Sequence, residues 1–177
     1  MGDTSITLIA IFLAAILMFV FPMMTLSDRN DEVTQLAIQT TTTEFVDNIR
    51  TTGKIKGEDY DKFLSTIAST GNAYEVELEV KVLDENAGKK TIQVSNTKIG
   101  ENKYVSDYTT QIENTLFLSN NKYGTYYLKE GDIISVKVKN SSLTLSQTLK
   151  NFYLKVAGDD TYIIVAEHAG IVAVNGN

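Results

Sequence analysis

The side chains that could carry out acid–base or nucleophilic chemistry are few and lie far apart along the chain. His168 is the only histidine among the 177 residues, and it lies at the end of a segment whose pattern predicts a strand. No G-x-S-x-G nucleophile motif occurs in the sequence. We therefore interpret His168 as a strand-end residue partly bonded to backbone, and we expect no catalytic residue and no enzyme activity.

Two sets of carboxylates could in principle bind a cation. Glu75, Glu77 and Glu79 alternate along one predicted strand, which is typical of a solvated strand face. Asp132 and the adjacent pair at 159–160 lack the D-x-D-x-D-G order of a calcium loop. We interpret both sets as surface and turn residues, so no metal site is predicted.

Phosphate, thiolate and nucleic-acid sites are also not expected. Residues 53–57 (GKIKG) lack the G-x-x-x-x-G-K-[ST] order of a phosphate-binding loop and are typical of a loop that leaves a helix. The chain has no cysteine, which excludes disulfides, thiolate metal ligands and a cysteine nucleophile. Its net charge is −6, without a cluster of Lys or Arg that could neutralise phosphates. We therefore predict no cofactor and no nucleic-acid partner.

The most informative element is the apolar segment at residues 6–26 (ITLIAIFLAAILMFVFPMMTL), which contains no charged side chain. At about 1.5 Å per residue, roughly 20 helical residues match a bilayer hydrocarbon core of about 30 Å. We predict a transmembrane helix over 6–26, preceded by a short flank at 1–5. Pro22 lies near one end of this helix, where a kink is tolerable.

Three alternatives are open for the N-terminus. A cleaved signal peptide is disfavoured, because the first 28 residues contain no Lys or Arg and residues 25–27 (TLS) are a weak cleavage site. An uncleaved single-span anchor is favoured. The third alternative is a pilin-type leader cleaved after Gly2, although Thr7 or Ala10 stands where type IV pilins carry a glutamate.

The remaining sequence predicts a stalk helix and linker at 27–57 and an α+β domain at 58–177. The acidic flank at 28–32 favours export of this domain, so we expect a single-pass protein of the cell membrane with an extracytoplasmic C-terminal domain. In the stalk helix, which is expected to continue the membrane span as one rod, spacings of three and four predict a helix face. The residues at these spacings are Val33, Leu36, Ala37, Thr40, Glu44, Phe45 and Ile49.

Alternating and helical periodicities divide the domain into strands and amphipathic helices. The clearest strands are 74–82 and 134–138, where apolar and polar residues alternate. The fold class is α+β, with a small antiparallel sheet and helices packed on one side. The expected helices are 30–52, 58–70, 104–118 and 143–156, and the other expected strands are 91–94, 123–128, 162–167 and 171–174, with Gly170 separating the last two.

Two segments resemble a known family. Residues 128–138 (LKEGDIISVKV) are similar to the G-D-x-V-x-V-x-V strand of TadE/TadF-type minor pseudopilins of Tad (Flp) pilus systems. Residues 43–55 (TEFVDNIRTTGKI) resemble Tad-associated pseudopilin-like proteins of Firmicutes. The resemblance implies a non-enzymatic protein whose apolar helix is held in the membrane and packs against other pilin helices.

From this resemblance we expect a membrane-anchored structural or assembly component of a bacterial surface appendage or secretion apparatus. Its partners would be the lipid bilayer and other pilin-like or secretion-apparatus subunits. Because helices in lipid approach each other closely at small residues, we expect Ala10, Ala14 and Ala15 to form the packing face. The alternative is a membrane-tethered module that binds an extracellular ligand or cell-wall component through Tyr123, Tyr126 and Tyr127.

Overall fold

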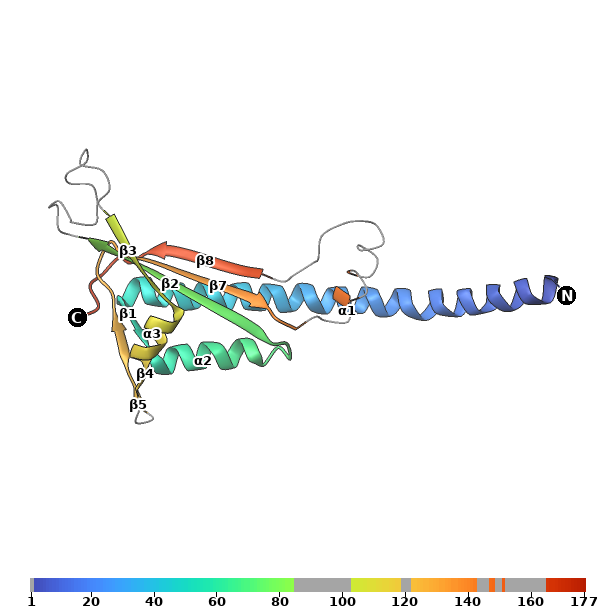
Figure 1. Ribbon diagram of the computed structural model, residues 1–177, viewed down its shortest axis with the longest axis horizontal. Helices are drawn as coiled ribbons and strands as arrows, with labels where there is room; N and C mark the ends of the chain where they lie inside the picture. Colours follow the sequence, from blue (N-terminus) through green and yellow to red (C-terminus); the bar gives the residue numbers. More distant parts are fainter. Residues whose placement is uncertain (1, 85–102, 119–121, 143–146, 149–150, 152–164) are drawn as a thin grey trace.

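A single long helix dominates the protein. The computed structural model describes residues 2–84, 103–118, 122–142, 147–148, 151 and 165–177. Helix α1, Gly2–Thr52, is continuous over 51 residues and joins the predicted membrane helix and the predicted stalk helix into one rod. Its N-terminal half projects from the domain as a free arm, while its C-terminal half lies along the domain (Figure 1).

The main sheet has four antiparallel strands in the order β3-β2-β7-β8. Strands β2 (Tyr74–Asp84) and β7 (Ile133–Asn140) form its centre, and they pair with Leu78 opposite Val136. Strands β3 (Lys103–Tyr108) and β8 (Val165–Ile171) flank them. The other strands among the described residues form two short ribbons: β1 (Lys54–Lys56) with β6 (Thr125–Tyr127), and β4 (Phe117–Leu118) with β5 (Lys122–Tyr123).

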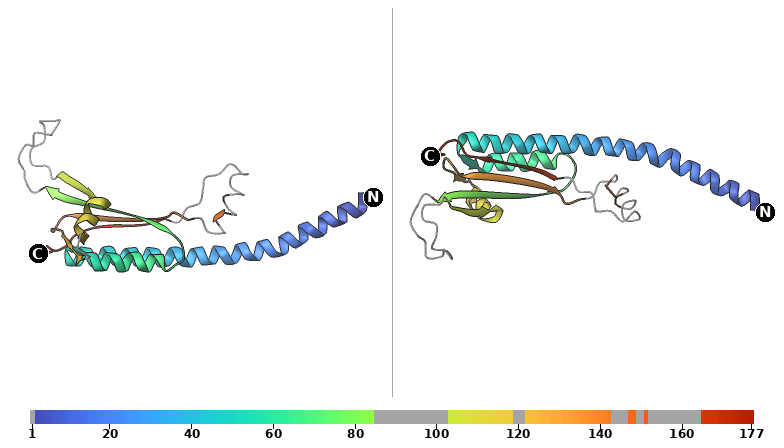
Figure 2. Two further views of the ribbon diagram at one scale, coloured as in Figure 1. Left: turned by 60° about the horizontal axis from the view of Figure 1, so that its bottom comes forward. Right: turned by 90° about the horizontal axis from the view of Figure 1, so that it is seen from above.

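The alternating sequences of β2 and β7 place their apolar side chains on one face of the sheet, as predicted. Helix α1 and helix α2 (Gly57–Ala68) pack on this face and run side by side (Figure 2). The rings of Phe45 on α1 and Phe63 on α2 stack with centroids 4.5 Å apart. The buried core also includes Ile38, Val46, Ile49, Tyr60, Ile67, Leu78, Val80, Ile134, Val136 and Val138. The α+β class with helices on one side of an antiparallel sheet is therefore confirmed.

The prediction of one helix over 104–118 is wrong. Residues Lys103–Tyr108 form β3, which pairs with the second half of β2, and only Thr109–Leu116 form helix α3. The Tyr108 amide donates to Gln111 Oε1 at 2.8 Å, which starts the helix. Thr109 Oγ1 accepts a hydrogen bond from the Leu78 amide at 2.8 Å, so α3 begins where β3 leaves the edge of β2.

Three strand predictions need smaller corrections. Gly170 does not separate two strands, because β8 runs through it to Ile171, and residues 172–174 lie outside any strand. The predicted strand 123–128 is divided between two ribbons, β5 and β6. The predicted strand 91–94, the pair at 159–160 and most of the predicted helix 143–156 lie outside the described residues, as does the first part of the predicted strand 162–167.

Candidate functional site: the N-terminal helix and its attachment to the domain

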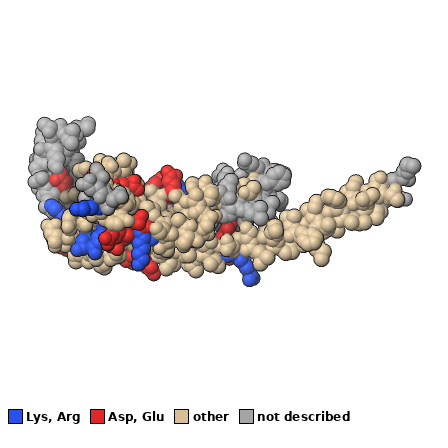
Figure 3. Space-filling view, turned by 90° about the horizontal axis from the view of Figure 1, so that it is seen from below, with Lys and Arg blue, Asp and Glu red and all other residues tan. Residues whose placement is uncertain are grey.

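The free arm of α1 is both apolar and exposed. Its side chains from Thr4 to Met23 are exposed, with Phe12 at 71% and Phe19 at 74%. Large aromatic and aliphatic side chains exposed along a whole rod are unfavourable in water and favourable in lipid. Within the described residues, one helix is long and apolar enough to cross a membrane: α1, in which an 18-residue window has a mean hydropathy of 2.7. In Figure 3 no charged side chain is coloured along most of the arm.

Pro22 lies inside the helix without breaking it. A proline has no amide to donate to the carbonyl four residues earlier, so a bend is expected near this position. Helix α1 is continuous and gently curved (Figure 2), and the Thr25 hydroxyl donates to the Phe21 carbonyl at 3.0 Å. The arm and the domain are thus joined by continuous helical backbone.

The small residues of the expected packing face lie on the arm. Ala10 and Ala14 are four residues apart and share one side of the helix, while Ala15 lies about 100° further round. All three are exposed. Gly2, the expected leader cleavage position, is the first residue of α1. All three alanines are therefore accessible to partner helices, with Ala10 and Ala14 on one side of the arm.

Beyond the arm, α1 has one face in the core and the opposite face free. Ile38, Phe45, Val46 and Ile49 are buried against the sheet and α2. Val33 and Leu36 are 68% and 65% exposed, and Ala37 and Thr40 are exposed too, so the prediction that these four share the face of Phe45 and Ile49 is wrong. The physical reason is that polar residues occupy part of the buried face, because Asp31, Thr34 and Thr42 are buried. The Thr42 hydroxyl donates to the Ile38 carbonyl at 2.7 Å.

The free face carries an apolar stripe, which we define as Leu26, Val33 and Leu36. These residues recur at spacings of seven and three, so they lie on one side of the helix, opposite the buried face. Leu26 is 70% exposed. The stripe therefore extends the apolar surface of the arm past the end of the predicted membrane segment and alongside the domain.

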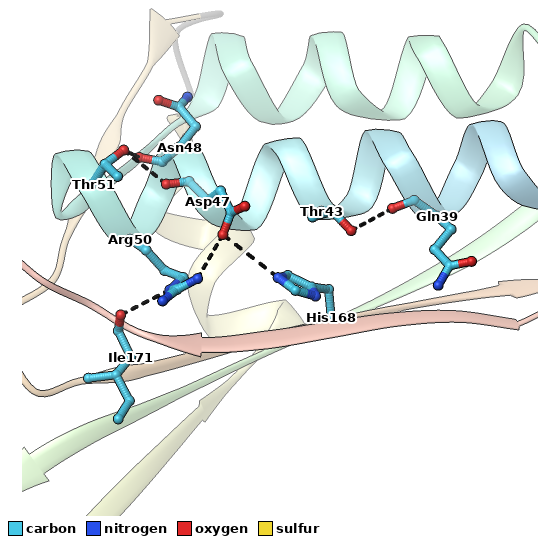
Figure 4. Close-up of polar contacts among 8 residues, drawn as sticks. All are labelled: Gln39, Thr43, Asp47, Asn48, Arg50, Thr51, His168 and Ile171. Carbon is cyan, nitrogen blue, oxygen red and sulfur yellow. Dashed lines mark hydrogen bonds and ion pairs between the residues drawn. The ribbon is translucent and has the colours of Figure 1, made fainter.

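A polar cluster ties the free arm's helix to strand β8 (Figure 4). Arg50 donates from Nη1 to Asp47 Oδ1 at 2.7 Å and from Nε to the Ile171 carbonyl at 3.1 Å. His168 Nε2 lies 3.7 Å from the same Asp47 oxygen. Gly170 leaves room for this cluster, because a Cβ there would lie 2.4 Å from Arg50 Nε. These contacts place the His168 side chain between helix and sheet. The prediction that His168 is a strand-end residue is wrong, because it is the central residue of β8 and pairs with Val136.

The end of α1 is fixed by a close approach of two backbones. Gly53 has φ of +66°, a conformation that favours glycine, and it terminates the helix as expected. Its carbonyl accepts from the Leu128 amide at 2.8 Å, and the Gly176 amide donates to the Leu128 carbonyl at 3.0 Å. The C-terminal residues are therefore packed against the last turn of α1.

The three tyrosines of the alternative ligand surface point in different directions. The Tyr126 hydroxyl donates to Asp107 at 2.6 Å and its ring packs against the core. Tyr127 is 59% exposed, as expected for the next residue of a strand. Tyr123 lies on β5, where its hydroxyl donates to Asp61 at 3.1 Å. Two of the three hydroxyls are therefore engaged within the domain, and the ligand surface stays a prediction.

The other candidate ligand groups are placed as follows. Asp132 is buried, and its carboxylate accepts from the amides of Leu83 and Lys129, both at 2.8 Å, which fits a turn residue. Residues 54–56 form β1, so the GKIKG segment is a short strand between two glycines. Within the described residues, no group of three or more His, Asp or Glu side chains could hold a metal ion.

Comparison with known proteins adds no relative: no protein-family model matches the chain, and no curated protein or solved structure does. The assignment of function therefore rests on the geometry of α1.

Proposed function

We propose that this chain is a membrane-anchored, non-enzymatic assembly protein of the pseudopilin-like type. The arm of α1 lies in the bilayer as a single span, and the α+β domain lies outside the cytoplasm. The observation that carries the proposal is the division of one continuous helix into an exposed apolar half and a half that is built into the domain core.

Continuity of the helix gives it a mechanical role. The core contacts of Ile38, Phe45 and Ile49 hold the second half of α1, so the orientation of the domain follows the orientation of the arm. The polar cluster of Asp47, Arg50 and His168 adds a second attachment to the sheet. A partner that fixes the orientation of the arm in the membrane would thus also fix the orientation of the domain, because α1 is continuous between them.

Helix–helix packing is the interaction that the arm supports best. Lipid chains are as apolar as leucine, so helices associate in a bilayer through close packing at small residues rather than through the hydrophobic effect. Ala10 and Ala14 supply such a face within the span. The stripe of Leu26, Val33 and Leu36 offers further apolar contact outside the span, where a partner helix would also shield it from water.

The double variant Ala14→Leu/Ala15→Leu tests this function. Leucine keeps the segment apolar, so membrane extraction should still require detergent, whereas the larger side chains should lower co-isolation with partner subunits by about tenfold. Leu13→Ile is the matched control, because it leaves the alanines intact. The proposal is contradicted if the double variant retains partners as the unaltered chain does, or if the unaltered chain is extracted from membranes as a partner-free monomer.

A further inference from the structure

The face of the sheet that points away from the core contains a hollow. Its volume is about 430 Å³, and its lining comes from β2, β3, β7, β8 and the first residue of α3. The lining side chains are Glu77 and Glu79 on β2, Tyr108 and Thr109, Ser135 and Lys137 on β7, and Glu167 on β8. We refer to these residues as the sheet hollow.

The register of the strands explains why this face is hollow. One row across the sheet reads Tyr108, Glu79, Ser135 and Ala169, since these residues are successive cross-strand partners. Ser135 and Ala169 are small, whereas the next row carries the long side chains of Glu77, Lys137 and Glu167. The missing volume at the two small residues leaves a depression that crosses the strands.

The charges around the sheet hollow compensate one another. The Lys139 ammonium lies 2.5 Å from the Glu77 carboxylate, and the Lys137 ammonium lies 3.8 Å from the Glu167 carboxylate. Glu79 lies 3.8 Å from Lys81 and also accepts from the Ser106 hydroxyl at 2.9 Å. With Glu75, which pairs with Lys139 across the strands, four carboxylates face three ammonium groups, and this near balance gives an anionic or a cationic ligand little net attraction.

An exposed aromatic ring stands at one end of the row. Tyr108 is 60% exposed, although its backbone is fixed by the bond from its amide to Gln111 and by the pairing with Glu79. A ring held on a rigid strand can contact a ligand without loss of backbone freedom. The ring presents an apolar face next to carboxylate acceptors and hydroxyl groups.

We propose that the sheet hollow binds a neutral oligosaccharide. A sugar ring combines an apolar face of C–H groups, which packs on an aromatic ring, with hydroxyl groups that donate to carboxylates and accept from ammonium and hydroxyl groups. The lining supplies each of these groups in one depression, with its charges already paired. This site is separate from the arm of α1 and does not depend on the proposed assembly function.

Titration of the purified full-length protein with chitohexaose and with cellohexaose tests the proposal. Saturable binding of either probe is expected, and the two probes distinguish a site that requires N-acetyl groups from one that does not. Tyr108→Ala should weaken the binding by about tenfold through loss of the ring contact. Ser135→Phe should abolish it, because the new ring fills the hollow while the variant residue remains on the solvated strand face.

Tyr127→Ala is the matched control, since it removes an exposed tyrosine that does not line the hollow, and binding should be unchanged. Thermal unfolding followed by circular dichroism checks that each variant is folded. If Ser135→Phe does not fold, the binding measured for Tyr108→Ala alone decides the test. Three results would overturn the proposal: neither probe binds at about 10 mM, where even a weak site of this kind would be occupied; binding survives both substitutions unchanged; or spermidine binds in their place.

Discussion

At the residue scale, two glycines with positive φ differ in how well they should tolerate substitution. Gly53 ends α1 with φ of +66°, and a Cβ there would lie 2.5 Å from the Gly176 amide nitrogen. Gly71 follows α2 with φ of +86°, yet nothing lies within 4 Å of a Cβ at that position. The two positions share the conformational requirement and differ only in the space available.

This difference predicts unequal effects of alanine. Gly71→Ala should lower the free energy of unfolding by about 1 kcal/mol, the strain of a left-handed non-glycine residue. Gly53→Ala should lower it by about 3 kcal/mol or more, because the backbones around Gly176 must also separate. Urea unfolding of the two variants in the same detergent measures the difference. Equal losses would show that the close approach of residues 53 and 176 is unimportant.

Tyr60 gives the domain a predictable response to alkaline pH. Its ring is buried, and burial together with the bond from its hydroxyl to Glu113 raises the pKa of the hydroxyl well above its usual range. In the unfolded chain the same hydroxyl titrates near about 10. Below that pH both states hold the proton and the stabilisation is complete; above it the unfolded state ionises first, so the free energy of unfolding falls.

Tyr60→Phe should therefore remove part of this alkaline loss. At pH 8 the variant should be less stable by about 1 kcal/mol, since the bond to Glu113 is lost, and its stability should then fall less steeply as the pH rises above about 10. Thermal unfolding followed by circular dichroism at several pH values gives both quantities. Tyr127→Phe, at an exposed ring, is the control; an identical pH slope in the Tyr60 variant and this control would refute the account.

At the element scale, the parts that could be predicted from sequence are those with long, regular patterns. The run at 6–26 is apolar without interruption, and β2 and β7 alternate apolar and polar residues along their length; the first is found as helix and the other two as strands. The stalk helix was predictable as a helix, but its buried face was not. Asp31, Thr34 and Thr42 occupy that face, and no hydropathy pattern identifies buried polar residues in advance.

Segments whose structure is set by distant partners could not be placed. Residues Lys103–Tyr108 become strand β3 because they pair with β2, although nearby apolar spacings also fit a helix. The aromatic and β-branched residues Tyr104, Val105 and Tyr108, which are enriched in strands, were the available signal. The cluster of Asp47, Arg50 and His168 joins residues about 120 positions apart, so only the tertiary structure shows it.

The two faces of α1 predict a separation of stability from assembly. Ile38 is 1% exposed and Leu36 is 65% exposed, only two residues away. Ile38→Ala should lower the free energy of unfolding by about 2–5 kcal/mol through a core cavity. Leu36→Ala should change it by less than about 0.5 kcal/mol. Comparable losses in urea unfolding would mean that Leu36 is not on a free face.

At the scale of the whole molecule, α1 assigns the two halves of the chain to different surroundings. The arm is apolar around its circumference, as expected of a helix surrounded by lipid. The domain shows intermixed acidic and basic side chains on the face seen in Figure 3, as expected of a surface in water. Between them, the stripe of Leu26, Val33 and Leu36 is an apolar surface that the domain leaves uncovered. We expect a partner helix that packs on the arm in the membrane to extend along this stripe.

Photocrosslinking from single cysteines labelled with benzophenone-maleimide in native membranes tests this central claim most directly, because the excited benzophenone inserts into a C–H bond of any neighbouring chain. The chain has no cysteine of its own, so each introduced thiol reports on one position without background. Val33→Cys lies on the stripe, and Ser65→Cys, exposed on α2, is the matched control away from it. We predict crosslinked products for Val33→Cys that weaken in the Ala14→Leu/Ala15→Leu background, and none for Ser65→Cys. Equal crosslinking at both positions, or none at Val33, would contradict assembly through the face of α1.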